Sequence, residues 1–301
     1  MSALRNRGIR PALLVGCLFL LALSVAGCSS GKAQSFNFKP DIFLQDLNPT
    51  SQGVLGALYV TIVISVVAQA LGVALGVLAA LGKMARILPF RVIANVYIWF
   101  FRGTPLLVQL VFFYFGFGAA HIWGWDDITI FGFFIPGALQ AAMVILGVNE
   151  GAYMAEIIRA GILAVDPGQT EAAKSLGMTY RLTMTRIVLP QAARVIIPPL
   201  GNEFNNMLKT TSLIFVLGVV ETYNHYVILQ GLNYRPFEAY AACALWFLLL
   251  TTIWGFIQSR IELRFARGTA TGSSAAQGPG WRARIFGGGP QVDEIGALGG
   301  H

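Results

Sequence analysis

Long apolar runs with few charges recur along this chain, and they constrain its fold more than any other feature. Five runs are long enough to cross roughly 30 Å of hydrocarbon as helices. They cover about residues 53–81, 93–120, 130–158, 195–220 and 237–259. A shorter run, residues 11–27, follows three arginines. The long runs do not alternate as barrel strands do, so we expect an all-α membrane protein with five core spans and an N-terminal hydrophobic segment.

The composition supports this class of protein. Of 301 residues, 55% are hydrophobic and 12% are charged, whereas soluble proteins carry roughly 25% charged residues. So few charges could not cover a water-soluble core, and disorder requires the opposite balance. The net charge of +7 fits basic cytoplasmic loops better than nucleic-acid binding. The three cysteines and three histidines are too scattered to predict a disulfide framework or a metal site.

The charges between the apolar runs predict their orientation. Segments after the first, third and fifth long runs are basic, whereas the two intervening loops are not. Lysine and arginine concentrate on the cytoplasmic side of membrane proteins. We therefore expect the first long run to begin on the outer side of the membrane and the last to end on its cytoplasmic side. The basic segments contain Lys83, Arg86, Arg91, Lys174, Arg181, Arg186, Arg194, Arg260, Arg264 and Arg267.

Both ends of the chain lie outside the predicted membrane domain, residues 53–266. Residues 1–28 read as a signal-like segment because an apolar run follows a basic start and ends at Cys28. Either Cys28 becomes a lipidated N-terminus, or the segment remains as an extra span. Residues 29–52 are expected to form an extracytoplasmic linker. Residues 267–301 are Gly-rich and are expected to form a disordered cytoplasmic tail.

The basic segment between the third and fourth long runs contains signals for two short helices. Asp166 is placed to cap a helix, and small residues at 172 and 173 form one apolar face. Gly177 permits the left-handed turn that ends this helix. A second helix is expected from about Thr179 to Pro190. The two short helices form either a projection on which a partner docks or an interfacial pair lying on lipid.

Two carboxylates lie well inside predicted spans, where an uncompensated charge costs several kcal/mol. They are Glu150 in the third long run and Glu203, beside Asn202, in the fourth. We expect these three residues to line a translocation path, where a carboxylate could receive an amino group or a cationic side chain. The alternative is a structural contact of Glu150 or Glu203 with Lys209.

Two other polar groups in the spans have a structural interpretation. Arg102, Thr104 and Pro105 predict a bent helix start that a charge stabilises. Glu156 and Arg159 lie three residues apart, on one helical face, and can pair near the cytoplasmic end of their span. Such a pair would secure the base of the basic segment described above.

Several motifs resemble those of one transporter family. Glu171-Ala172-Ala173, followed by Gly177 and then Leu189-Pro190, resembles the EAA signature of permease subunits in bacterial ABC importers. Residues 101–109, 152–162, 198–203 and 208–213 resemble the polar amino acid branch, which includes histidine, glutamine and arginine permeases. The resemblance covers about residues 50–266.

This resemblance implies the transmembrane domain of a type I ABC importer for polar amino acids, with coupling helices between the third and fourth core spans. Two permease subunits, identical or paired, would form the pathway. The EAA segment would dock on a cytoplasmic ATPase dimer, and a solute-binding protein would deliver substrate outside. The chain has no GxxxxGK[ST] phosphate loop, so ATP and Mg²⁺ would belong to the ATPase and this chain would not be an enzyme.

Other functions remain as alternatives. The solute could instead be cystine, an opine or another amino-acid-like compound. A channel or receptor would not need a helical projection between spans, and the chain has neither an HExxH nor a GxSxG motif for an intramembrane hydrolase.

Overall fold

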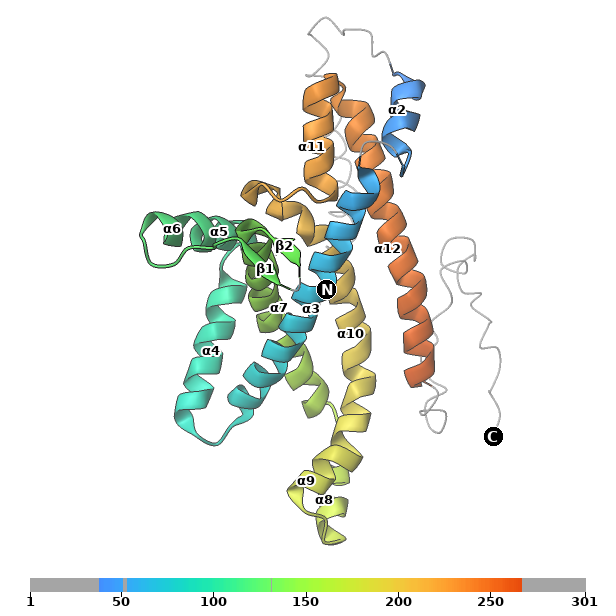
Figure 1. Cartoon of the computed structure of the whole chain (residues 1–301). Coiled ribbons are helices and arrows are strands. Elements are labelled where there is room, and N and C mark those ends of the chain that lie inside the picture. Colours follow the sequence, from blue (N-terminus) through green and yellow to red (C-terminus); the bar gives the residue numbers. More distant parts are fainter. Residues whose placement is uncertain (1–37, 51–52, 131, 267–301) are drawn as a thin grey trace, which may run out of the picture.

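A computed structural model describes residues 38–50, 53–130 and 132–266 (Figure 1). Three of its helices are each long and apolar enough to cross a membrane: α3 (Val54–Met84), α7 (Gly137–Leu163) and α12 (Pro236–Ala266). Two bent helix pairs can each form one further span. Counted in this way, the predicted five core spans are confirmed. Cys28, the N-terminal hydrophobic segment and the Gly-rich tail lie outside the described residues.

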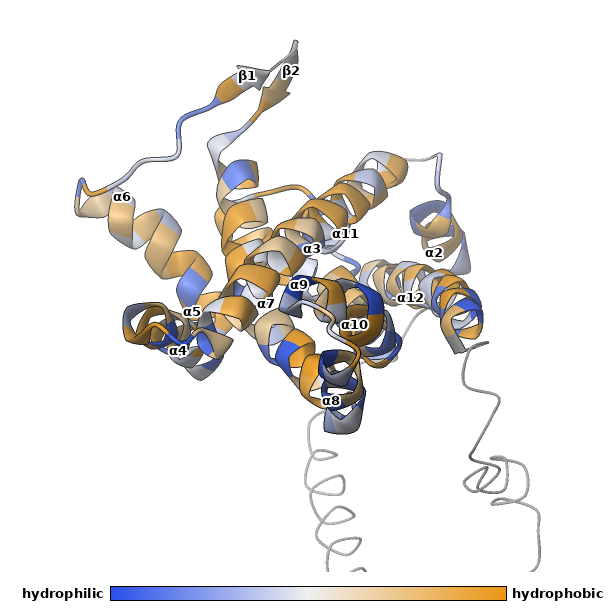
Figure 2. Cartoon of the chain, turned by 90° about the horizontal axis from the view of Figure 1, so that it is seen from below, coloured by the Kyte–Doolittle hydropathy of each residue, from blue (hydrophilic) through white to orange (hydrophobic). Residues whose placement is uncertain are grey.

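The pair α3 and α7 forms the centre of the bundle, and glycines bring the two helices close together. A Cβ atom at Gly72 would lie 2.6 Å from Cγ of Glu150, and one at Gly76 would overlap Met154. Glycines of α7 fit in the same way against leucines of α3. Close approach through small residues is a main source of attraction between helices in lipid. Figure 2 shows that both helices are mostly hydrophobic.

The second apolar run does not form one straight helix. It contains α4 (Leu88–Gly103), α5 (Leu106–Val111), a π-helical turn η2 (Phe112–Gly116) and α6 (Phe117–Ala119). The direction changes by 106° between α4 and the segment that follows it. Proline has no N–H group and excludes the residue before it from helical geometry. The bend accordingly lies at Thr104, which is extended, and Pro105.

The third span begins later than the sequence predicts. The prediction starts it at residue 130, but this residue ends strand β1 (Ile128–Ile130), which pairs with β2 (Phe133–Ile135) in an antiparallel hairpin. The helix α7 starts only after Pro136. The short turn between the strands needs positive φ, which Gly132 adopts at 82°. Within the described residues, these are the only strands.

The basic segment also differs in part from the prediction. Its first helix, α8 (Pro167–Ser175), ends before Gly177, which has a φ of 74° as expected. The second helix, α9 (Tyr180–Thr183), does not end at Pro190. It continues through a π-helical turn, η3 (Met184–Val188), into α10 (Leu189–Thr210). A proline ring clashes with the carbonyl four residues before it, and here that residue lies in the wider π turn.

The fourth span is longer and more broken than expected. After α10 the chain forms a 3₁₀ helix, η4 (Thr211–Leu217), and then α11 (Thr222–Asn233), in a region read from the sequence as a loop. The carboxylate of Glu221 caps α11 by accepting bonds from the N–H groups of Tyr223 (2.9 Å) and Asn224 (2.8 Å). Because this capping depends on a buried acid, the apolar pattern did not indicate it.

A short helix, α2 (Pro40–Leu47), packs against α12 at the end of the molecule opposite α8 and α9 (Figure 1). Its Asp46 is only 1% exposed, and neither carboxylate oxygen has a hydrogen-bond partner. Tyr226 of α11 donates to the main-chain carbonyl of Asp46 instead, at 2.7 Å. Burial raises the pKa of the Asp46 carboxyl above its usual value, and the charge of Glu238 raises it further.

We predict that Gly76→Ala destabilises the protein by about 1–3 kcal/mol, because the added Cβ has no room beside Met154. Thermal unfolding in detergent measures this effect. Gly56→Ala is the matched control, since it lies in the same helix with nothing within 4 Å. Equal melting temperatures for the two variants would contradict the close packing of α3 and α7.

We predict that Asp46→Asn raises stability at neutral pH by about 1 kcal/mol, since it removes a buried, unpartnered charge. The raised pKa means that the folded state binds the proton more tightly, so lowering the pH stabilises the parent chain. The advantage of Asp46→Asn should therefore shrink as the pH falls through the folded pKa. Asp41→Asn, on the same helix but exposed, is the control. A stability gain of Asp46→Asn that does not change with pH would contradict the raised pKa of Asp46.

Candidate functional site

A polar cavity of about 620 Å³ lies between α7 and α10, where α5 and η4 also contribute residues to its wall. Both helices are membrane-spanning, so the cavity brings polar groups into the interior of the bundle. Side chains with hydrogen-bonding or charged groups dominate one part of the lining. They are Asn149, Glu150, Tyr153, Glu203, Asn206, Lys209 and Thr210.

The two carboxylates singled out in the sequence meet in this cavity. Glu150 is 6% exposed and accepts a hydrogen bond at 3.2 Å from the Nε2 of Gln69 on α3. Glu203 is half-buried, and the Nδ2 of Asn206 donates to it at 3.5 Å. Asn202 is not among the lining residues, because it accepts a bond from Gln258 of α12 at 3.0 Å. The cavity therefore collects two of the three residues expected to line a path.

Lys209 supplies a positive charge to the same cavity, where its side chain is exposed. Within the described ranges it makes an ion pair with neither Glu150 nor Glu203. The alternative, a structural contact of Glu150 or Glu203 with Lys209, stays a prediction, since all three residues line the same cavity. The same cavity presents separate groups of both signs, which can receive a ligand that carries both charges.

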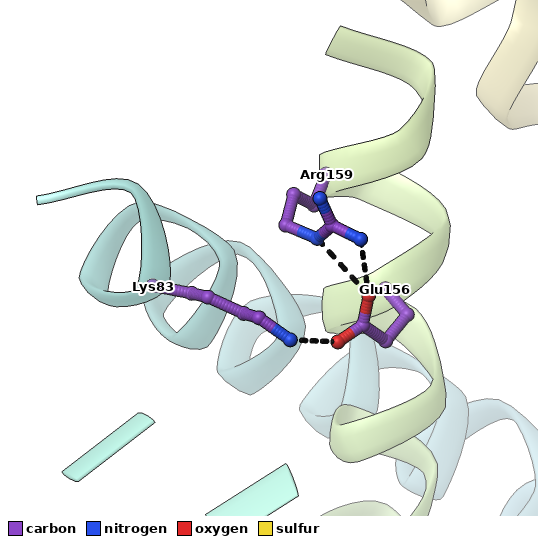
Figure 3. Close-up of polar contacts among 3 residues, drawn as sticks. All are labelled: Lys83, Glu156 and Arg159. Atoms are coloured by element: carbon purple, nitrogen blue, oxygen red, sulfur yellow. Dashed lines mark hydrogen bonds and ion pairs between the residues drawn. The ribbon is translucent and has the colours of Figure 1, made fainter. Parts of the chain in front are cut away.

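An ion-pair cluster joins α3 and α7 near the α8 end of the bundle (Figure 3). Arg159 donates to Glu156 at 3.0 Å, as the spacing predicted. Lys83, at the end of α3, pairs with the other oxygen of Glu156. The sequence did not indicate Lys83 as a partner of Glu156, because nothing in its local pattern shows which helix it faces. The three side chains are 20–33% exposed, so the cluster is partly buried and connects the end of α3 to α7.

Arg102 lies at the bend of the second run, where its guanidinium stands 5.2 Å from the ring centroid of Tyr153 in α7. A cation over an aromatic face is attracted by the ring quadrupole. The interaction connects α4 to the helix that carries Glu150. Arg102 therefore has the structural environment that the sequence suggested, with Tyr153 as a partner that the sequence could not name.

The projecting α8 segment combines order with exposed apolar side chains. Asp166 caps α8 by accepting from the N–H of Gly168 at 2.8 Å. Ala173 is buried, at 3% exposed, whereas its neighbours Glu171 and Ala172 are exposed. Leu176 is 82% exposed. The structure therefore separates the small residues into one that packs within the loop and one that faces outward.

A helical bundle with several spans, an internal polar cavity and an ordered projecting loop defines a membrane transport protein. Residues 72–267 match the family model of the binding-protein-dependent transport system inner membrane component. The chain belongs to this family and is a multi-pass component of the inner membrane. This confirms the resemblance to ABC importer permeases that the motifs carry.

Several known proteins are similar to the chain over most of its length. The arginine transport system permease protein ArgU of Corynebacterium glutamicum is 38% identical over 72% of this chain and 69% of its own. The nopaline transport system permease protein NocQ of Agrobacterium fabrum is 36% identical over 64% and 82%. A crystal structure of an amino acid ABC transporter with histidines matches with a TM-score of 0.64 and 38% identity, over 77% and 100%.

Proposed function

We propose that this chain is the permease subunit of an ABC importer that translocates polar amino acids. The observation that carries the proposal is the cavity in which Glu150 and Glu203 face a solvent-accessible space together with Lys209. An amino acid carries an ammonium and a carboxylate group. Carboxylates can bind the ammonium or a cationic side chain, and Lys209 can bind the carboxylate.

The energetics of the membrane interior favour this interpretation. Charged side chains at this depth are costly unless they face a partner or a water-filled cavity, and they commonly mark substrate pathways. The relative named for arginine transport and the transporter crystallised with histidines fit a polar amino acid, whereas the relative named for nopaline transport fits an opine. Cystine, an opine or another amino-acid-like solute would present similar groups and remains the alternative.

We further propose that the α8 loop couples the permease to an ATPase. The residues assigned to this role are Glu171, Ala172, Ala173, Gly177, Leu189 and Pro190. Leu176 and Tyr180 support it, because they are 82% and 73% exposed and lie on either side of the turn between α8 and α9. Large apolar side chains that remain exposed commonly mark an interaction surface. Closure of the ATPase dimer around ATP would move two such loops and the helices attached to them.

The remaining partners follow from the same proposal. ATP and Mg²⁺ would be bound by the ATPase, which would also catalyse hydrolysis. A second permease subunit, identical or related, would complete the pathway. A solute-binding protein would dock on the side opposite α8, in keeping with the family's dependence on a binding protein. The proposal gives no role to nucleic acid.

We predict that Glu150→Gln and Glu203→Gln each lower amino acid uptake at least about tenfold, because a neutral amide binds an ammonium group more weakly than a carboxylate does. Uptake of labelled amino acid into cells or vesicles measures the effect. Glu262→Gln is the matched control, since Glu262 of α12 lies outside the cavity lining. Wild-type uptake in both cavity variants, with normal assembly, would remove the path assignment.

We predict that Gly177→Asp leaves membrane insertion intact but abolishes uptake and co-purification of the ATPase. A Cβ at Gly177 meets no atom within 4 Å, so the aspartate would project from the surface proposed for docking, and the φ of 74° strains any side chain there. Gly218→Asp is a matched control because Gly218 has a similar φ of 78°, also with no atom within 4 Å, outside the α8 loop. Retention of the ATPase by Gly177→Asp, or equal loss in both variants, would argue against docking at this loop.

A further inference from the structure

The break in the second span leaves backbone carbonyl groups without helical partners inside the bundle. In hydrocarbon such groups must be satisfied by the protein itself. Gln109 of α5, which is 2% exposed, supplies the donors. Its Nε2 lies 3.0 Å from the carbonyl oxygen of Phe101, 3.1 Å from that of Thr104 and 2.7 Å from the Thr104 hydroxyl. This one side chain therefore holds the bend from within.

A second amide connects the bend to α7. Asn149, which is 8% exposed, donates from Nδ2 to Oε1 of Gln109 at 3.0 Å and to the Phe101 carbonyl at 3.0 Å. Asn149 precedes Glu150 and lines the polar cavity with it. The contact between Gln109 and Asn149 therefore connects the start of α5 directly to the helix that carries the buried carboxylate.

The helix α5 also contributes to the wall of the cavity. Leu106 at its start lines the cavity together with Leu213 of η4. One turn further on, Leu110 is fully buried in an apolar cluster with Leu146 and Ile214. The α7 residues of this cluster lie between the cavity and the end of α7 opposite the α8 loop. Leu106 of α5 and Leu213 of η4 thus form part of the cavity wall on the side where the charges place the outside.

We propose that Gln109 and Asn149 are positioning residues for transport. Their amide contact holds α5 in place as the outer wall of the cavity, and this wall must move for the cavity to open outward. The bend at Thr104 and Pro105 provides the pivot, because a proline break lets α5 turn without disrupting α4. Neutral amide hydrogen bonds suit such a contact, since they are directional but weak enough to break and re-form. The proposal rests on the cavity being the solute path.

Thiol labelling from the outer face tests the position of α5 directly. The reporter is Leu106→Cys in the full chain, assembled with its partners in vesicles without nucleotide, and the probe is a membrane-impermeant maleimide. The parent chain, which has Cys17, Cys28 and the buried Cys243, gives the background. We expect slow labelling of the reporter and about tenfold faster labelling once Gln109→Ala removes the contact.

A double-mutant cycle separates a shared contact from general loosening. Asn149→Ala should accelerate labelling as Gln109→Ala does, and the combination should give less than the product of the two effects, because both changes remove the contact between the two amides. Gln140→Ala is the matched control: its amide also donates to two main-chain carbonyls, those of Asp126 and Ile135, at 2.8 and 3.0 Å. An unchanged rate for Gln109→Ala, a multiplicative effect in the combination, or equal acceleration by Gln140→Ala would overturn the proposal.

A conservative variant keeps the test decisive if Gln109→Ala does not assemble. Gln109→Glu retains an acceptor for Asn149 but cannot donate to both carbonyls, so labelling should be faster than in the reporter alone. A labelling rate equal to that of the reporter alone would overturn the proposal. If Gln109→Ala accelerates labelling while Glu150→Gln and Glu203→Gln keep wild-type uptake, the role of α5 as the outer wall would be supported and the cavity would not be the solute path. If Gln109→Ala leaves labelling unchanged while Glu150→Gln and Glu203→Gln lose uptake, the cavity would be supported as the solute path and the role of α5 would be overturned.

Discussion

The contact between α3 and α7 is the interaction on which the rest of the bundle depends. Glycines at 72 and 76 let the backbones approach where any side chain would collide with Glu150 or Met154. Because lipid is as apolar as leucine, close packing of this kind replaces the hydrophobic driving force found in water. The approach also places Gln69 beside Glu150, so the packing that holds the helices together also supports the polar cavity.

The lipid environment also determines where polar groups can lie in the structure. A bend in hydrocarbon is tolerated only when the freed carbonyls find donors, and Gln109 and Asn149 supply these donors at the break after α4. Side-chain charge is confined in the same manner: Glu156 pairs with Lys83 and Arg159, whereas Glu150 and Glu203 face the cavity. Most of these polar atoms therefore satisfy the backbone, form ion pairs or line the cavity.

Reasoning from the sequence was most successful where one local property decides the outcome. Apolar length predicted the spans, and Gly177 and Asp166 predicted the limits of α8, because a left-handed turn and a cap depend on nearby atoms. It was wrong where a distant or buried group decides. Pro190 was expected to end a helix that continues through a π turn, and the start of the third apolar run forms a hairpin rather than helix.

The sequence by itself determined the class of protein, the basic side of the bundle, the α8 loop and the family. These follow from hydropathy, charge and short motifs, which are local properties of neighbouring residues. Only the tertiary structure decided which polar groups share a space: Glu150 and Glu203 with Lys209, but not Asn202, which turns toward α12. Spacing along one helix cannot settle such contacts, because they depend on the rotation and bending of another helix, and a single broken span changes both.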